Sequence, residues 1–222
     1  MDEIALHYTR ICAEIHALSQ QAGQESPVLV AVSKTFPASA VLEAYGAGCR
    51  DFGENRLPEF LQKVRELPRD IRWHFVGQLQ SRKARDVVGK AHLIHSLDRL
   101  SLAEAVEKQA ASLKLVQGCL VQVNIGDEPQ KGGVKPADLS GFIGQLRSFP
   151  HVEVRGLMCI PPASEDATLY FRQMRQLRQR MQEEFPGLGG ELSMGMSDDY
   201  SLAVREGSTL VRIGSAIFGQ RG

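Results

Sequence analysis

Short apolar runs alternate along this chain with longer segments whose apolar residues recur every three or four positions. An unbroken short run is typical of a strand buried on both faces, and the wider spacing is typical of a helix with one buried face. The first helix is predicted over residues 2–22, with an apolar stripe formed by Ile4, Tyr8, Ile11, Ile15 and Leu18. About three heptads make a short oligomerisation seam, so we expect this helix to pack on its own domain.

Strands and helices are then predicted in strict alternation. The strands are expected at 28–34, 50–53, 72–76, 92–96, 118–125, 152–160, 191–194 and 209–213, and the helices between them at 38–45, 56–67, 80–88, 100–113, 137–149, 164–185 and 198–206. This order favours parallel strands and predicts an α/β fold: a single-domain (β/α)8 barrel of the TIM type over residues 1–222, with an extra N-terminal helix. A doubly wound open sheet is the alternative, although no GxGxxG motif follows the first strand.

Composition narrows the possible functions. The 222 residues are 43% hydrophobic and carry 26 basic and 26 acidic side chains, a balance that gives no electrostatic footprint for nucleic acid or an anionic membrane. The four cysteines lack CxxC spacing and are expected to be thiols of a reducing compartment: Cys12, Cys49, Cys119 and Cys159. Because no leader or membrane-spanning run is evident, we expect a cytoplasmic protein. We also expect a monomer with no metal site and no nucleic-acid or membrane partner.

Lys34 ends the first predicted strand. The two-residue period of a strand places it on the same inward face as Val28, Val30 and Val32. Burial lowers the pKa of a lysine ammonium, and the neutral amine can attack a carbonyl and form a Schiff base. The alternative is a lysine whose ammonium only reaches solvent at the strand end.

Polar residues also follow other predicted strands, whose carboxyl ends would form the active face of a barrel. Asn55 follows the second strand, and Ser197, Gly214 and Ser215 follow the seventh and eighth. Barrels often bind phosphate between these last two loops, at the N-terminus of a short helix. The two serines are equally suited to cap helices, and one role does not exclude the other.

Seven motifs resemble those of the pyridoxal phosphate homeostasis proteins, single-domain relatives of the alanine racemase barrel. In chain order they are VAVSKT at 30–35, FGEN at 52–55, HFVGQLQ at 74–80, VNIGDEPQKGG at 123–133, RGLMCIP at 155–161, SMGMSDD at 193–199 and STLVRIGSAIFG at 208–219. They span nearly the whole chain. One departure is Ser81-Arg82-Lys83, where the family usually has a residue followed by Asn-Lys.

The resemblance implies pyridoxal 5′-phosphate (PLP) as the cofactor. The contacts it implies are a Schiff base at Lys34, phosphate contacts from Ser197, Gly214 and Ser215, a contact between Arg212 and the pyridine nitrogen, and a place for Asn55 in the pocket wall. Arginine is always charged and only donates hydrogen bonds, so it would leave the ring nitrogen unprotonated and weaken the ring as an electron sink.

Three functions follow as hypotheses. The favoured one is a non-enzymatic PLP carrier or buffer that regulates vitamin B6 and amino-acid homeostasis, with PLP-dependent apo-enzymes as recipients. The second is a monomeric racemase-like PLP enzyme, although similar racemases have a C-terminal β domain that we do not expect in a chain ending at Gly222. The third is a class I aldolase-like barrel whose lysine attacks a phosphorylated sugar. Glu128 and Lys131 receive no role.

Overall fold

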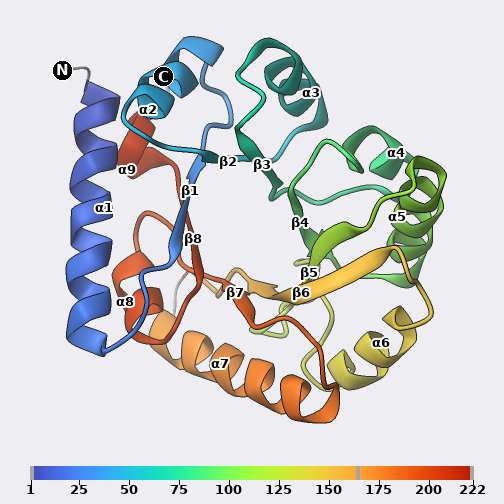
Figure 1. The fold of residues 1–222 in the computed structure, drawn as a ribbon. Coiled ribbons are helices and arrows are strands. Elements are labelled where there is room, and N and C mark those ends of the chain that lie inside the picture. The colour runs from blue at the N-terminus through green and yellow to red at the C-terminus, as the bar shows by residue number, and fades with distance from the viewer. Residues whose placement is uncertain (1–2, 164–165, 221–222) are drawn as a thin grey trace.

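The strands of the computed structural model close into a barrel (Figure 1). The structure describes residues 3–163 and 166–220. Within them eight parallel strands pair in chain order, and the last returns to the first, with Val30 beside Arg212. The strands are β1 (Val28–Val32), β2 (Asp51–Glu54), β3 (Arg72–Phe75), β4 (Leu93–Leu97), β5 (Gln117–Val123), β6 (Val152–Cys159), β7 (Glu191–Ser193) and β8 (Leu210–Ile213). The predicted TIM-type barrel is confirmed, and the open sheet is excluded.

Helices surround this ring of strands (Figure 1). They are α1 (Glu3–Ala22), α2 (Ala38–Gly46), α3 (Leu57–Glu66), the 3-10 turn η1 (Ser81–Lys83), α4 (Ala84–Val87), α5 (Leu100–Leu113), α6 (Leu139–Leu146), α7 (Ala167–Glu184), α8 (Tyr200–Arg205) and α9 (Ser215–Phe218). Helix α1 packs against α2, α8 and α9 and buries Ile11 and Ile15. The apolar stripe of this helix therefore packs on its own barrel, as predicted.

Several predicted boundaries differ from the structure. The helix expected at 80–88 is observed as η1 followed by the single turn of α4, which ends at Val87 because Val88 leaves the helical conformation and Gly89 has a φ of 79°. The first two residues of the helix expected at 164–185 lie outside the described residues, as do residues 1–2 and 221–222 of the expected domain. The prediction of a strand at 28–34 is wrong at its end, because β1 stops at Val32.

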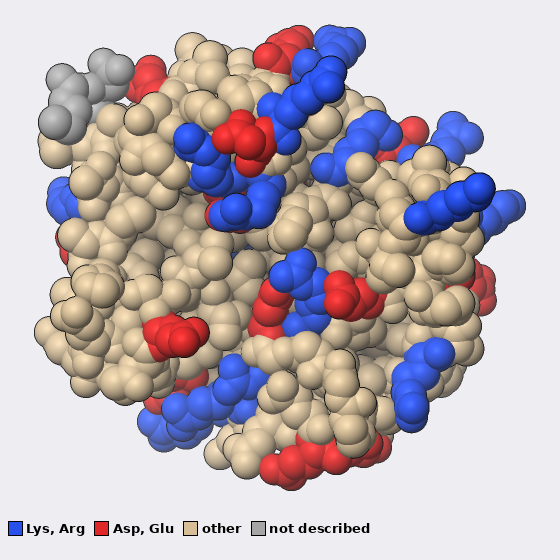
Figure 2. Space-filling model, viewed as in Figure 1, with Lys and Arg blue, Asp and Glu red and all other residues tan. Residues whose placement is uncertain are grey.

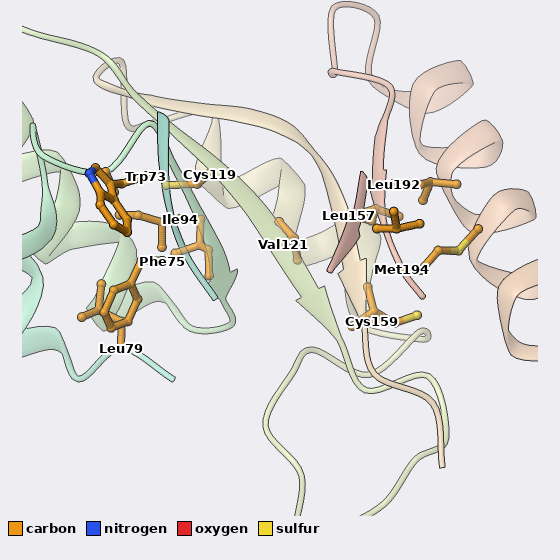
Figure 3. Packing of buried hydrophobic residues seen from close by; sticks show 14 of the residues in the cluster. Trp73, Phe75, Leu79, Ile94, Cys119, Val121, Leu157, Cys159, Leu192 and Met194 are labelled. Carbon is orange, nitrogen blue, oxygen red and sulfur yellow. The ribbon is translucent and has the colours of Figure 1, made fainter. Parts of the chain in front are cut away.

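Two apolar layers hold the barrel together. Outward-facing strand residues pack beneath the helices, among them Trp73, Phe75, Val121 and Leu157 (Figure 3). A smaller cluster fills the middle of the barrel and consists of Val30, Leu93, Leu120, Met158 and Leu210. Strand alternation explains this division, because neighbouring residues of a strand point to opposite faces of the sheet.

Charged side chains of both signs are interspersed on the face drawn in Figure 2, in keeping with 26 basic and 26 acidic residues. Across the described ranges, none of the helices combines the length and the apolarity that crossing a bilayer requires. Nor do the described residues contain a cluster of histidine, cysteine and carboxylate groups suited to a metal ion.

Candidate functional site

A cavity of about 390 Å³ opens at the carboxyl ends of the strands. Each of the six residues predicted for the site lines it: Lys34, Asn55, Ser197, Arg212, Gly214 and Ser215. These residues lie far apart along the chain and follow or end β1, β2, β7 and β8. Parallel strands bring their carboxyl ends to one edge of the barrel, which explains why the positions converge.

Lys34 occupies the turn after β1 rather than the strand itself. The N–H group of Ser33 donates to the carbonyl oxygen of Gly53 at 3.0 Å, and the chain then turns. The inward alternation of Val30, Val32 and Lys34 nevertheless holds, because Val30 lies in the barrel centre and the other two line the cavity. Val28, expected on the same buried row, is 42% exposed, because it lies at the opposite rim of the barrel.

Helix α3 holds the peptide groups on both sides of Lys34. The ammonium of Lys63 donates to the carbonyl oxygen of Ser33 at 2.7 Å. The carboxylate of Glu59 accepts from the N–H group of Thr35 at 2.6 Å. Thr35 has a φ of 70°, a value uncommon for a residue other than glycine and maintained only where surrounding contacts enforce it. Glu59 and Lys63 are four residues apart, so they share one face of the helix and together fix the backbone at Lys34.

A buried ion pair anchors this arrangement. Lys63 lies 2.5 Å from Oε1 of Glu54, which also accepts from the Ser33 hydroxyl at 2.7 Å. Glu54 is fully buried, and burial raises the pKa of its carboxyl group even though Lys63 opposes that shift. The sequence analysis missed both residues of the pair. Glu54 was visible only as part of the FGEN motif, and no spacing rule connects it with Ser33.

The loops after β7 and β8 are joined by one hydroxyl group. Oγ of Ser197 accepts hydrogen bonds from the backbone N–H groups of Gly214, at 3.3 Å, and Ala216, at 3.4 Å. A Cβ added at Gly214 would lie 3.2 Å from the carbonyl oxygen of Val32, so the small residue lets this loop approach β1 closely. The cavity therefore has a wall of backbone N–H groups and serine hydroxyls, the donor set that binds phosphate.

Arg212 forms another part of the cavity wall. Its Nη1 donates to Oγ of Ser193 at 2.6 Å, and its Nη2 donates to the carbonyl oxygen of Cys159 at 2.9 Å. The residue is 5% exposed, and this burial lowers the pKa of the guanidinium. Arginine stays protonated under such a shift, so the cavity contains an oriented cationic donor.

Asn55 has a buried polar atom without a partner. Its Oδ1 has no hydrogen bond within the described structure, and such an atom normally finds a partner in the protein, in water or in a ligand. A Cβ at Gly77 would lie 2.2 Å from the carbonyl oxygen of Asn55, so glycine is required for the two segments to meet. Asn55 thus brings to the cavity wall a hydrogen-bond acceptor, Oδ1, that no described residue uses.

Sequence reasoning missed other residues of the cavity wall. Gln78 donates through Nε2 to Oε1 of Gln122 at 2.9 Å, and Gln122 donates to the carbonyl oxygen of Gly132 at 3.1 Å. Gln78 was visible in the HFVGQLQ motif, but a glutamine within a strand gives no comparable signal at position 122. Glu128 and Lys131 pair with each other at 2.5 Å and lie outside the cavity wall.

Known proteins of one family match this chain over nearly its full length. The family described as alanine racemase, N-terminal domain, matches residues 6–222. The pyridoxal phosphate homeostasis protein of Aquifex aeolicus is 42% identical over 219 residues, which cover 96% of each chain. The protein of the same name from Escherichia coli K12 is 40% identical, covering 100% of this chain and 98% of its own.

Solved structures agree with the family match. PipY of Synechococcus elongatus with PLP bound is 40% identical and has a TM-score of 0.82, covering 97% of this chain and 100% of that chain. Alanine racemase from Corynebacterium glutamicum has a TM-score of 0.72 at 18% identity, covering 99% of this chain and 61% of that one, and shares the fold alone. This chain therefore belongs to the alanine racemase N-terminal domain family and, within it, to the pyridoxal phosphate homeostasis proteins.

Proposed function

We propose that this protein binds PLP through a Schiff base at Lys34 and carries or buffers the cofactor for vitamin B6 and amino-acid homeostasis. The observation that carries the proposal is the convergence of an amine, a buried guanidinium and a group of phosphate-type donors on one cavity. PLP offers a matching set of groups: an aldehyde, a pyridine nitrogen and a phosphate. The names of the relatives, and the PLP bound to PipY, support the same ligand.

The residues present fit this cofactor. Asn55 contributes a buried oxygen without a partner, Ser197 and Ser215 contribute hydroxyls, and Gly214 allows close backbone approach. When bound, PLP supplies an aldehyde that reacts reversibly with amines and a ring that can accept electrons.

Lys34 provides the nucleophile in this proposal. Its amine would hold the cofactor through the aldehyde, which would supply the carbonyl carbon for a reversible Schiff base formed with loss of water. The contacts from Lys63 and Glu59 hold the backbone on either side of Lys34, so that the amine reaches the cavity from a fixed turn. Ser197, Gly214 and Ser215 would hold the phosphate.

Arg212 is the reason why we propose a carrier of PLP rather than an efficient enzyme. As a donor to the ring nitrogen it would leave that nitrogen unprotonated, which limits stabilisation of a carbanion at an amino acid. The protein would then release PLP to apo-enzymes rather than turn over amino acids. We further propose that residues 1–222 form one PLP-binding domain of a cytoplasmic monomer. The free thiols of Cys12, Cys49, Cys119 and Cys159 support a reducing compartment.

Visible absorption of the purified protein with added PLP, before and after borohydride, tests the proposal. A band that borohydride abolishes, with the added mass retained on the protein, is the expected result. A protein that stays colourless with PLP but is trapped by borohydride with a phosphorylated sugar would favour the aldolase-like alternative. Measurable turnover of a panel of D- and L-amino acids would favour the racemase-like alternative.

A further inference from the structure

A row of polar side chains crosses the barrel interior from Arg212 to the opposite rim. Nη1 of Arg212 lies 2.6 Å from Oγ of Ser193, which lies 2.9 Å from Nδ1 of His95. Nε2 of His95 lies 2.9 Å from Nδ1 of His74, and Nε2 of His74 lies 3.1 Å from Oδ1 of Asp51. All five residues are buried. Such a row is unusual inside a barrel, where apolar side chains normally fill the centre.

The far end of the row lies at the amino ends of the strands. Arg72 donates through Nε to Oδ1 of Asp51 at 2.7 Å and through Nη2 to Oδ2 at 2.5 Å. Burial alone would raise the pKa of Asp51, but hydrogen bonds from His74 and Arg72 outweigh it and lower that pKa to about 2. Asp51 is therefore ionised at neutral pH and only accepts hydrogen bonds, whereas Arg212 only donates them.

These two ends restrict how the histidines are protonated. Because Asp51 only accepts, Nε2 of His74 carries a proton. If His74 is neutral, its Nδ1 accepts from Nε2 of His95, and Nδ1 of His95 then accepts from the Ser193 hydroxyl. If His74 is doubly protonated, the bonds between it and Ser193 reverse, and Nδ1 of His95 donates to Ser193.

The Ser193 hydroxyl proton distinguishes the two patterns. Among the described residues, Arg212 and His95 are the recorded partners of this hydroxyl. In the reversed pattern both of them donate to its oxygen, and its own proton has no acceptor, which is costly for a buried group. In the neutral pattern the Ser193 hydroxyl and the ring N–H groups of His95 and His74 each have an acceptor within the row. Burial also lowers the pKa of His95 well below its ordinary value, in keeping with a neutral ring.

We infer that Ser193 and His95 are positioning residues for Arg212, which they hold through hydrogen bonds that all point from Arg212 toward Asp51. In this row the Ser193 hydroxyl and the two histidine rings each accept a hydrogen bond on one side and donate one on the other. Hydrogen bonds aligned in this way strengthen one another. The Arg212 guanidinium is thereby fixed with its remaining donors toward the cavity. The inference deepens the proposed function, because it assumes that Arg212 contacts the bound cofactor.

Nitrogen-15 NMR of histidine-labelled protein without PLP tests the direction of the bonds. At neutral pH, His95 and His74 should both be neutral and carry their proton on Nε2. A doubly protonated His74, or a proton on Nδ1 of His95, would overturn the inference. This measurement uses the unaltered protein and does not depend on PLP binding, so its failure is separate from a failure of the proposed function.

Two substitutions of His95 separate positioning from packing. In His95→Asn the side-chain amide lies near the former Nδ1 and can still accept from Ser193, whereas in His95→Gln the amide lies near the former Nε2 and reaches only His74. We expect the glutamine variant to bind PLP about tenfold more weakly, the effect of one lost hydrogen bond, and the asparagine variant to lose clearly less.

The absorption maximum of bound PLP provides a second measurement on the two His95 variants, because it responds to the donor at the ring nitrogen. It should shift more in His95→Gln than in His95→Asn. Equal losses of affinity with an unchanged absorption maximum would mean that His95 only fills space. Normal PLP binding by the unaltered protein, measured alongside, shows that the proposed function itself holds.

Discussion

The ammonium of Lys63 lies 2.7 Å from the carbonyl oxygen of Ser33, the residue directly before Lys34. Lys63 belongs to α3 and Ser33 to the turn after β1, so this bond connects the barrel wall with the outer helix that covers it. Glu54 completes the contact by accepting from both residues. The position of the proposed Schiff-base lysine thus depends on an ion pair that is itself buried.

Replacing Lys63 with methionine should destabilise the protein by about 3–5 kcal/mol, because the substitution leaves the Glu54 carboxylate buried without its cation. The free energy of unfolding in urea measures the loss. The double variant Lys63→Met/Glu54→Gln is the matched control and should recover much of the stability, since its neutral amide can still accept from Ser33. Equal destabilisation in the single and double variants would show that Lys63 contributes packing rather than charge.

The phosphate contacts are tested with Ser215→Ala. Loss of one charge-assisted hydrogen bond, worth about 1.5–3 kcal/mol, should weaken PLP binding by about tenfold or more. Pyridoxal, which has no phosphate, should bind both proteins weakly and equally. Ser112→Ala is a suitable control, because the recorded hydrogen bond of that exposed serine, among the described residues, is to the carbonyl oxygen of Gln109 in its own helix. If unaltered protein bound pyridoxal as tightly as PLP, the phosphate would not lie at this wall.

Protonation of Asp51 in acid should lower the free energy of unfolding. Its pKa is lowered from 3.8 to about 2 in the folded protein, so its contribution is complete above the unfolded value and is lost as pH falls from about 4 to 2. A shift of this size corresponds to about 2 kcal/mol. Unfolding free energies measured across this pH range should show the loss, and Asp51→Asn should lack that component. A variant with the same acid sensitivity as the unaltered protein would contradict the assignment.

Amino acids added to the PLP-loaded protein should not exchange their α-proton rapidly. Arg212 would leave the ring a weak electron sink, so proton abstraction lacks its main stabilisation. NMR in deuterated water, with alanine and serine in the presence of the PLP-loaded protein, measures the exchange. Rates of about 1 s⁻¹ or faster, the low end of ordinary enzymes, would support a racemase-like enzyme instead.

Much of the fold and the site was predictable from local pattern. Apolar runs marked the strands, and the rule that carboxyl ends of parallel strands converge was enough to bring Lys34, Asn55 and Ser197 to one cavity. Arg212 was named only through the family resemblance. The helix predicted at 80–88 forms as a 3-10 turn and a single α-helical turn ending at Val87, because apolar spacing neither distinguishes the two helix types nor marks where Val88 leaves the helical conformation. Pattern reports the faces of an element more reliably than its ends.

The hydrogen-bonded row inside the barrel was not predictable in the same way. His95 and Ser193 are 98 residues apart, and both occupy positions where a strand pattern predicts apolar side chains. Their pairing depends on the register and closure of the barrel, which only the assembled structure defines. Lys63 was hidden for a similar reason, since a lysine on an amphipathic helix is ordinarily read as solvent-exposed.

Peptide mapping after borohydride reduction tests the central claim most directly. The protein is loaded with PLP, reduced, digested and analysed by mass spectrometry, with Lys34→Ala and Lys135→Ala treated in parallel. Lys135 is a surface residue paired with Asp127, so its variant should keep both the visible band and the adduct. The account predicts that the reduced cofactor is found on Lys34 and that the Lys34→Ala protein has neither band nor adduct. An adduct on a different lysine of the unaltered protein, with Lys34 unmodified, would contradict it.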